Sequence, residues 1–140
     1  MSSMILVNNA YITLEYIPDE QLIYHTIHQP IASQPEVFKS ALNLGTETLR
    51  QHGATKWLSD DRRNGPLPPE MIEWAITDWN MRTIQAGWKF WANVVPEAVA
   101  AAGTLTPVID NLYQFGLKMR VFTQLEDAHA WLKRQSVPQP

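Results

Sequence analysis

The sequence predicts an α/β protein with a mixed β-sheet, in which antiparallel N-terminal strands precede a parallel β-α-β-α-β-α portion. Three observations lead to this prediction. The first 30 residues contain three strand-like segments and no helical period. From residue 33 onward, segments with helical spacing alternate with short apolar segments. Strands that alternate with helices are joined by crossovers, and crossovers make neighbouring strands parallel.

Three strands are predicted before the first helix. Residues 11–16 alternate in polarity, with Ile12, Leu14 and Tyr16 on one face. A short apolar segment at 4–7 precedes them, and the intervening Asn8-Asn9 pair suits a hairpin turn. Turn residues at 18–20 then separate this hairpin from a third strand at 22–27.

A helix is predicted over residues 35–52. Apolar side chains recur there at three- and four-residue spacing, with polar side chains on the opposite face. The segment Ser33-Gln34-Pro35-Glu36 fits a capping box, in which the Ser33 hydroxyl and the Glu36 carboxylate bond to free N–H groups of the first turn. Gly53 suits the left-handed residue that ends such a helix.

Two more strand–helix units and a final strand and helix follow. The predicted strands are 56–60, 89–95 and 119–122, and the middle one carries Phe90, Trp91, Ala92, Val94 and Val95, as expected of a strand covered on both faces. The predicted helices are 69–86, one that starts at Thr106 and closes at Gly116, and one that runs through Leu132 after a second capping box, Thr123-Gln124-Leu125-Glu126. Residues 98–102 either form a helical turn or stay irregular.

The helix at 69–86 carries one apolar stripe. Its members are Met71, Ile72, Ala75, Ile76, Trp79, Thr83 and Ala86. A single domain over residues 1–134 is expected, with 135–140 as a flexible tail.

Composition narrows the class of protein. The chain has 140 residues, 45% of them hydrophobic, and a formal net charge of −3, which indicates a globular domain and not a disordered chain. The absence of Cys excludes disulfides and thiolate metal sites. No apolar run reaches the roughly 18 residues of a membrane span, and no signal-peptide pattern is present, so a cytoplasmic protein is expected.

Nucleic acid, metals and cofactors are not expected as ligands. A sequence pI of about 5.7 argues against nucleic-acid binding. The four His residues do not have metal-ligand spacing, and no phosphate-binding glycine loop or Ser-His-Asp pattern appears.

The loop at 60–64 is the strongest candidate site. It contains Asp60, Asp61, Arg62, Arg63 and Asn64, and it follows a central strand, where ligands of open α/β sheets gather. One interpretation is that Arg62 and Arg63 clamp an anionic ligand or an acidic patch of a partner. The alternative is that the Asp and Arg side chains pair with each other and shape the turn.

Six Trp residues form the second feature of interest. Trp79 fits the apolar stripe and is predicted to be core, whereas Trp74 lies to one side and is predicted to form a contact surface. Several Trp side chains could also line a pocket for a hydrophobic ligand. On the same helix, Asp78 and Arg82 stand four residues apart and are predicted to form an ion pair.

The element order, together with four stretches, resembles the bacterial SpoIIAA-like proteins of the STAS/SEC14 type. The stretches are KWLSDDRRNG at 56–65, WAITDW at 74–79, AGWK at 86–89 and EDAHAWL at 126–132. This resemblance covers nearly the whole chain and implies a mixed sheet with helices packed around it. The best-known members are anti-sigma-factor antagonists, protein-binding switches that are phosphorylated on a Ser after a central strand. Here the matching stretch, 60–65, contains no hydroxyl residue.

These observations favour a non-enzymatic regulatory module that binds a protein partner or a small ligand through the 60–64 loop and the adjoining Trp helix. A homodimer would be one way to cover exposed Trp surface. An alternative is a carrier of a small hydrophobic ligand or lipid, which needs an apolar cavity under the Trp residues. A third is an enzyme that uses Asp60 or Asp61 as a base.

Overall fold

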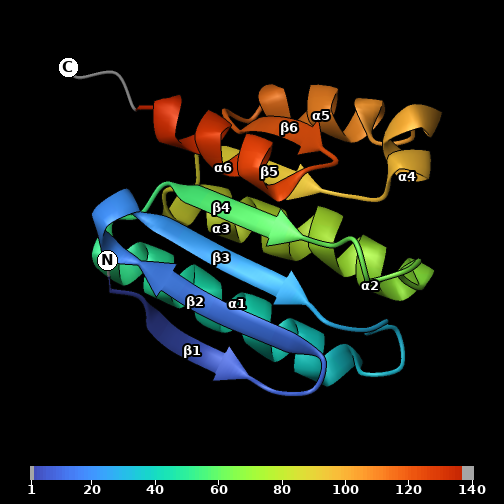
Figure 1. Cartoon of the computed structure of the whole chain (residues 1–140), viewed down its shortest axis with the longest axis horizontal. Coiled ribbons are helices and arrows are strands. Elements are labelled where there is room, and N and C mark those ends of the chain that lie inside the picture. The colour runs from blue at the N-terminus through green and yellow to red at the C-terminus, as the bar shows by residue number, and fades with distance from the viewer. Residues whose placement is uncertain (1, 137–140) are drawn as a thin grey trace.

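A computed structural model of the chain describes residues 2–136. Six strands form one sheet whose spatial order follows the chain, β1-β2-β3-β4-β5-β6 (Figure 1). The strands are β1 (Met4–Asn8), β2 (Ile12–Ile17), β3 (Leu22–Ile27), β4 (Lys56–Asp60), β5 (Phe90–Val94) and β6 (Lys118–Phe122). The helices are η1 (Pro18–Glu20), α1 (Pro35–His52), α2 (Pro69–Trp74), η2 (Ala75–Trp79), α3 (Asn80–Ala86), α4 (Glu97–Ala102), α5 (Thr106–Tyr113) and α6 (Leu125–Arg134).

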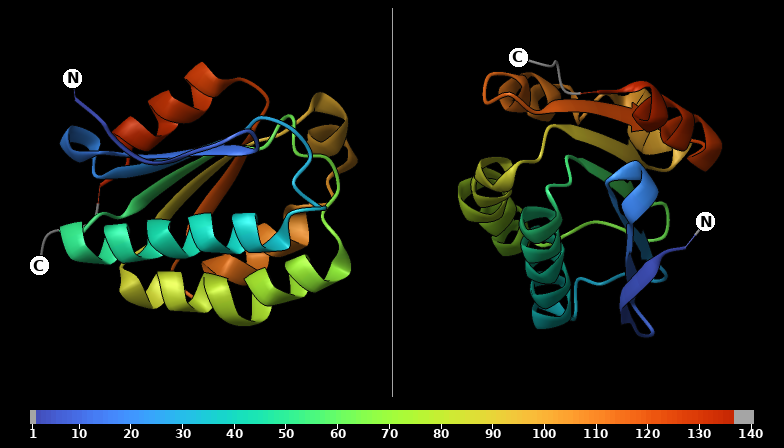
Figure 2. Two further views of the ribbon diagram at one scale, coloured as in Figure 1. Left: turned by 90° about the horizontal axis from the view of Figure 1, so that it is seen from below. Right: turned by 90° about the vertical axis from the view of Figure 1, so that its left-hand side faces the viewer.

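The sheet is mixed, as predicted. Strands β1, β2 and β3 pair antiparallel, and β3 to β6 pair parallel. Each of the three parallel connections, from β3 to β4, β4 to β5 and β5 to β6, leads to the neighbouring strand on the same side. Because such crossovers are right-handed, their helices lie on one face of the sheet. Figure 2 shows this arrangement, with α1, α2–α3 and α5 on one side of the sheet and α6 alone on the other.

The two faces of the sheet bury separate cores. The larger core lies between the sheet and the crossover helices and includes Ile23, Leu49, Trp57 and Trp88, each at most 1% exposed. The smaller core lies under α6, where Ala128, Trp131 and Leu132 pack on the strands. Strand β5 is therefore covered on both faces, which explains its mostly apolar sequence.

Neither predicted capping box forms. The N-cap residues are Gln34 and Gln124, and neither helix has a side-chain cap hydrogen bond. Pro35 occupies the first helical position, so Ser33 lies one residue too early to cap. Thr123 is displaced from its helix in the same way. At the other end of α1, Gly53 does adopt the expected left-handed conformation, with φ of 65°.

The predicted helix at 69–86 is continuous but contains a π-helical turn, η2. A π turn adds one residue to the turn and shifts the phase of the helix faces. As a result the predicted stripe is only partly correct, because Ile72 and Ile76 are 45% and 51% exposed while Trp79 is buried. Residues 98–102, left open by the sequence, belong to helix α4.

No helix among residues 2–136 is both long and apolar enough to cross a bilayer. The last four residues of the predicted tail, 137–140, lie outside the described part of the chain.

Candidate functional site

A cavity of about 230 Å³ lies between the sheet and the crossover helices, at the carboxyl ends of β3, β4 and β5. Its lining is mostly apolar and includes Phe38 and Leu42 from α1 and Ala75 from η2. In open α/β sheets this edge is where ligands bind. An adjoining groove of about 440 Å³ between α3 and α5 is larger but lacks the polar groups described below.

Three polar side chains form a row across the strands at this cavity. His25 is in register with Ser59 between β3 and β4, and Ser59 is in register with Asn93 between β4 and β5. Residues in register on adjacent parallel strands point to the same face, here the face that α1 covers. All three are buried, with exposed fractions of 5%, 1% and 6%. Ligand-binding pockets typically have a mostly apolar lining with a small number of polar groups at defined positions.

His25 is held by two hydrogen bonds. The Trp57 indole N–H donates to His25 Nδ1 over 3.0 Å, and His25 Nε2 lies 2.9 Å from Asp61 Oδ1. An indole N–H can only donate, so Nδ1 accepts and the ring carries its proton on Nε2. In this network His25 is thus a neutral imidazole that donates to Asp61 and orients its carboxylate.

Asp61 lies at the rim of the cavity, one residue past β4. Its backbone N–H donates to the Val94 carbonyl over 2.9 Å, which ties it to β5, while its carboxylate reaches His25 on β3. The side chain is 23% exposed. Oδ2 makes no hydrogen bond within residues 2–136, so one carboxylate oxygen is available to a ligand.

Ser59 and Trp91 form a second contact in the lining. The Trp91 indole N–H donates to Ser59 Oγ over 2.9 Å. The Ser59 hydroxyl therefore acts as an acceptor toward Trp91 and keeps its own proton to donate.

Two buried polar atoms of the lining residues have no hydrogen-bond partner among the described residues. They are Trp79 Nε1, a donor, and Asn93 Oδ1, an acceptor, on side chains 4% and 6% exposed. Leaving such a group unpaired costs about 1–3 kcal/mol. Native proteins rarely accept this cost except where water or a ligand supplies the partner.

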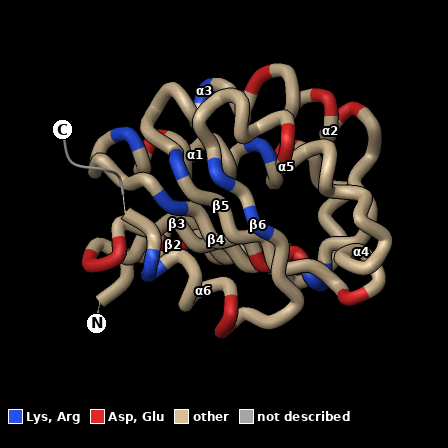
Figure 3. The backbone as a smooth tube through the Cα atoms, turned by 90° about the horizontal axis from the view of Figure 1, so that it is seen from above, with Lys and Arg blue, Asp and Glu red and all other residues tan. Residues whose placement is uncertain are grey.

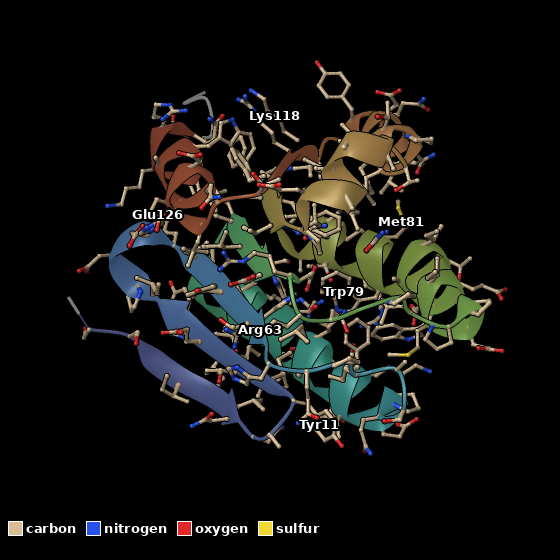
Figure 4. The ribbon with its side chains drawn as sticks, turned by 45° about the vertical axis from the view of Figure 1, so that its right-hand side comes forward. Tyr11, Arg63, Trp79, Met81, Lys118 and Glu126 are labelled. Atoms are coloured by element: carbon tan, nitrogen blue, oxygen red, sulfur yellow. The ribbon has the colours of Figure 1, made fainter. Side chains whose placement is uncertain are left out.

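The π turn contributes to the placement of Trp79. Figure 4 shows this side chain in the interior between the helices and the sheet. Its ring packs edge-on against Trp57 and Trp88, with ring centroids 5.1 and 5.3 Å apart. These contacts confirm that Trp79 is core, yet they leave its N–H unpaired. π turns within α-helices are frequently found at functional sites.

The structure divides the predicted 60–64 loop between two sides of the sheet. Ser59 faces the cavity, so the next residue along the strand, Asp60, points to the opposite face of the sheet. On that face Arg62 donates hydrogen bonds from Nε and Nη2 to the Asp60 carboxylate over 2.9 and 2.8 Å. Arg62 therefore forms the turn-shaping pair with Asp60 that the second interpretation of this loop describes. Arg63 is exposed beside it. Only Asp61 and Asn64 of this loop line the cavity.

Asn64 is buried, and its side chain anchors the loop through a hydrogen bond. Its Oδ1 accepts the Ile31 backbone N–H over 3.3 Å, which joins the loop to the segment before α1. This contact closes one wall of the cavity.

The remaining predicted residues, Trp74 and Asp78, do not line the cavity. Trp74 is half-buried against Trp79 and Phe38, and the Lys39 ammonium lies 5.5 Å from its ring centroid. Asp78 forms the predicted ion pair with Arg82 over 2.7 Å on the exposed side of the helix.

The sequence analysis did not predict that His25, Ser59 and Asn93 lie together. The available signal was a polar residue near the carboxyl end of each of three successive strands. In the sequence, His25 is one of four His residues without metal-ligand spacing. Among residues 2–136, no cluster of three or more His, Asp or Glu side chains could hold a metal ion.

We expect Arg62→Met to make the fold more sensitive to acid. Burial raises the pKa of Asp60, but its hydrogen bonds to Arg62 and the charge of Arg62 outweigh that effect and lower the pKa below its ordinary value of 3.8. The pair therefore stabilises the fold above about pH 4, and this contribution is lost as the pH falls through the folded pKa. Without Arg62, burial raises the pKa of Asp60 and the acid unfolding midpoint moves to higher pH.

Circular dichroism against pH measures that midpoint. Because Arg62 is 40% exposed, the loss in unfolding free energy at pH 7 is only about 1 kcal/mol. Arg63→Met removes an adjacent exposed guanidinium and serves as the control, with an unchanged midpoint. Equal midpoints for the two variants would contradict the assignment.

No protein-family model, curated protein or solved structure matches the chain. The function is therefore inferred from the geometry of the cavity and its polar groups.

Proposed function

We propose that the protein is a binding module for a small, mostly apolar molecule that carries its own hydrogen-bonding group. The observation that carries this proposal is the pair of unpartnered buried atoms, Trp79 Nε1 and Asn93 Oδ1, among the residues of an apolar cavity. A ligand with one donor and one acceptor would satisfy both.

The size of the cavity limits the size of the ligand. A cavity of about 150 Å³ holds benzene. The cavity here, at about 230 Å³, is half as large again and suits a single ring with a short substituent. Among the functions expected from the sequence, a carrier of a small hydrophobic molecule thus has more support than a carrier of a whole lipid.

The polar row supports binding more than catalysis. Both ring nitrogens of His25 are engaged, one by Trp57 and the other by Asp61. The Ser59 hydroxyl bonds to Trp91, and no hydrogen bond within residues 2–136 joins it to His25. A nucleophile requires such a bond to a base.

A protein partner docking on the loop and the Trp helix has less support. Trp79 is buried and Arg62 is paired, so neither is free to act as an interface anchor. The proposal rests on the cavity and not on the resemblance to SpoIIAA-like proteins, whose best-known members bind protein partners.

Filling the cavity is expected to abolish binding. In Ala75→Phe the new ring would occupy the space of the ligand, so the affinity for benzyl alcohol and other single-ring fragments should fall at least tenfold. Two-dimensional NMR of labelled protein measures the affinity and shows whether amides of the cavity residues shift. Ala130→Phe, on the exposed side of α6, makes the same change on the opposite face of the sheet and should bind as the parent does.

Trp79→Phe tests the same proposal without added bulk. It removes the unpartnered N–H and keeps most of the ring, so binding of a hydroxyl ligand weakens by about 0.5–1.5 kcal/mol while folding is maintained. The proposal fails if no single-ring fragment shifts the cavity amides, or if Ala75→Phe folds and binds as the parent does.

A further inference from the structure

We infer that the ligand is a small amine: its donor is an ammonium group directed at the Asp61 carboxylate and the Asn93 side-chain carbonyl, and the acceptor for Trp79 Nε1 belongs to another part of the ligand. This inference rests on the proposed function and adds the charge and chemical class of the ligand.

Asp61 supplies an uncompensated negative charge at the rim. Its hydrogen-bond partner, His25, is a neutral imidazole in this network because Nδ1 accepts from Trp57. The lining contains no Lys or Arg side chain. A carboxylate with a free oxygen and no cation beside it attracts a cationic group and repels an anionic one.

Asn93 is an independent second acceptor. Its Oδ1 is unpartnered within the described residues, and the side chain is 6% exposed. Asn93 is in register with Ser59, and Asp61 follows two residues after Ser59, so both side chains line the cavity from the same face of the sheet. An ammonium group has three donors and no acceptor, which suits a cavity with two free acceptors.

The helices around the cavity carry charges of both signs. Helices α2, η2, α4 and α5 carry acidic residues and no Lys or Arg, and Figure 3 shows the acidic positions on that side of the molecule. These residues are Glu70, Glu73, Asp78, Glu97 and Asp110. Helices α1 and α3, which also line the cavity, carry Lys39 and Arg82, so the preference for a cation rests on Asp61 and not on these surface charges.

The experiment compares three probes of one size, namely benzylamine, benzyl alcohol and benzoate. At pH 7 they present an ammonium, a hydroxyl and a carboxylate on the same ring. We expect benzylamine to bind at least tenfold more tightly than benzyl alcohol in NMR titrations, and benzoate to bind most weakly. Because the preference is ionic, it should shrink when salt is raised.

Asp61→Asn removes the charge and keeps an oxygen that can accept from His25. In this variant benzylamine should lose its tenfold advantage over benzyl alcohol. Asp110→Asn removes an equal charge from the exposed side of α5 and should leave both affinities unchanged.

Asn93→Leu, which removes an unsatisfied acceptor, should weaken the binding of benzylamine without lowering the stability of the fold.

The outcomes separate the two proposals. If benzyl alcohol binds as tightly as benzylamine, or if Asp61→Asn leaves benzylamine unaffected, the amine inference is overturned and the cavity is still a ligand site. If none of the three probes shifts the cavity amides, both the inference and the proposed function are overturned.

Discussion

Trp57→Ala is expected to lower the free energy of unfolding by about 3–5 kcal/mol, the range for removing a fully buried Trp side chain. Trp57 is 1% exposed and packs against Trp79, Trp88 and His25, with ring centroids 5.1, 5.9 and 6.1 Å away. The substitution leaves a void at the centre of the larger core and removes the N–H that bonds to His25 Nδ1. For a domain with a total stability of about 5–15 kcal/mol, this leaves little margin.

Urea unfolding followed by circular dichroism measures the loss. Trp74→Ala is the comparison, because Trp74 is on the same side of the sheet but only half-buried, and it should cost clearly less. A loss below about 1.5 kcal/mol for Trp57→Ala would contradict the packing described for this core.

Trp57→Phe should keep the fold but release the His25 ring, so that Asp61 is less firmly oriented and benzylamine binds more weakly.

Gly45→Val is expected to cost about 3 kcal/mol, at the upper end of the range for overpacked cores. A Cβ built at Gly45 would lie 2.4 Å from Cη2 of Trp57 and 3.1 Å from its Cζ3. Trp57 is enclosed and cannot move away, so α1 would have to shift from the sheet. Valine also gains only a few tenths of a kcal/mol over glycine in helix propensity, which does not offset the clash.

Gln51→Val introduces the same side chain on the exposed face of α1 and should change stability by less than about 0.5 kcal/mol. Combining Gly45→Val with Trp57→Leu tests the cause, because the smaller residue makes room for the valine. The two substitutions should then be less destabilising together than the sum of their separate effects. Strict additivity would show that the cost of Gly45→Val does not arise from Trp57.

Much of the fold follows from local patterns. The bounds of α1 and β4 match the prediction, because apolar spacing and a terminal glycine mark α1, and β4 lies between that glycine and the loop that begins at Asp61. The mixed sheet follows from the alternation of strands and helices, which requires crossovers. The capping boxes failed because a one-residue shift in the N-cap moved Ser33 and Thr123 outside their helices.

The candidate site owes less to local patterns. The cavity lies at the carboxyl edge of β4, where the sequence analysis placed its candidate loop, and of the eight candidate residues Asp61, Asn64 and Trp79 line it. Asp60 and Arg62 form the alternative structural pair. Adjacent residues in an extended chain point to opposite faces, so a run of charged residues is split between the two sides of the sheet.

The sequence by itself determined the order of elements, the direction of the strands and the chemistry available at the end of β4, since these depend on periodicity and on neighbours along the chain. Only the tertiary structure decided that His25 meets Asp61, 36 positions away, and that His25, Ser59 and Asn93 share one row. Strand register and the π turn set those contacts, and both depend on how whole elements pack. The unpartnered atoms of Trp79 and Asn93 become visible only once the hydrogen-bond partners of the neighbouring lining residues are in place.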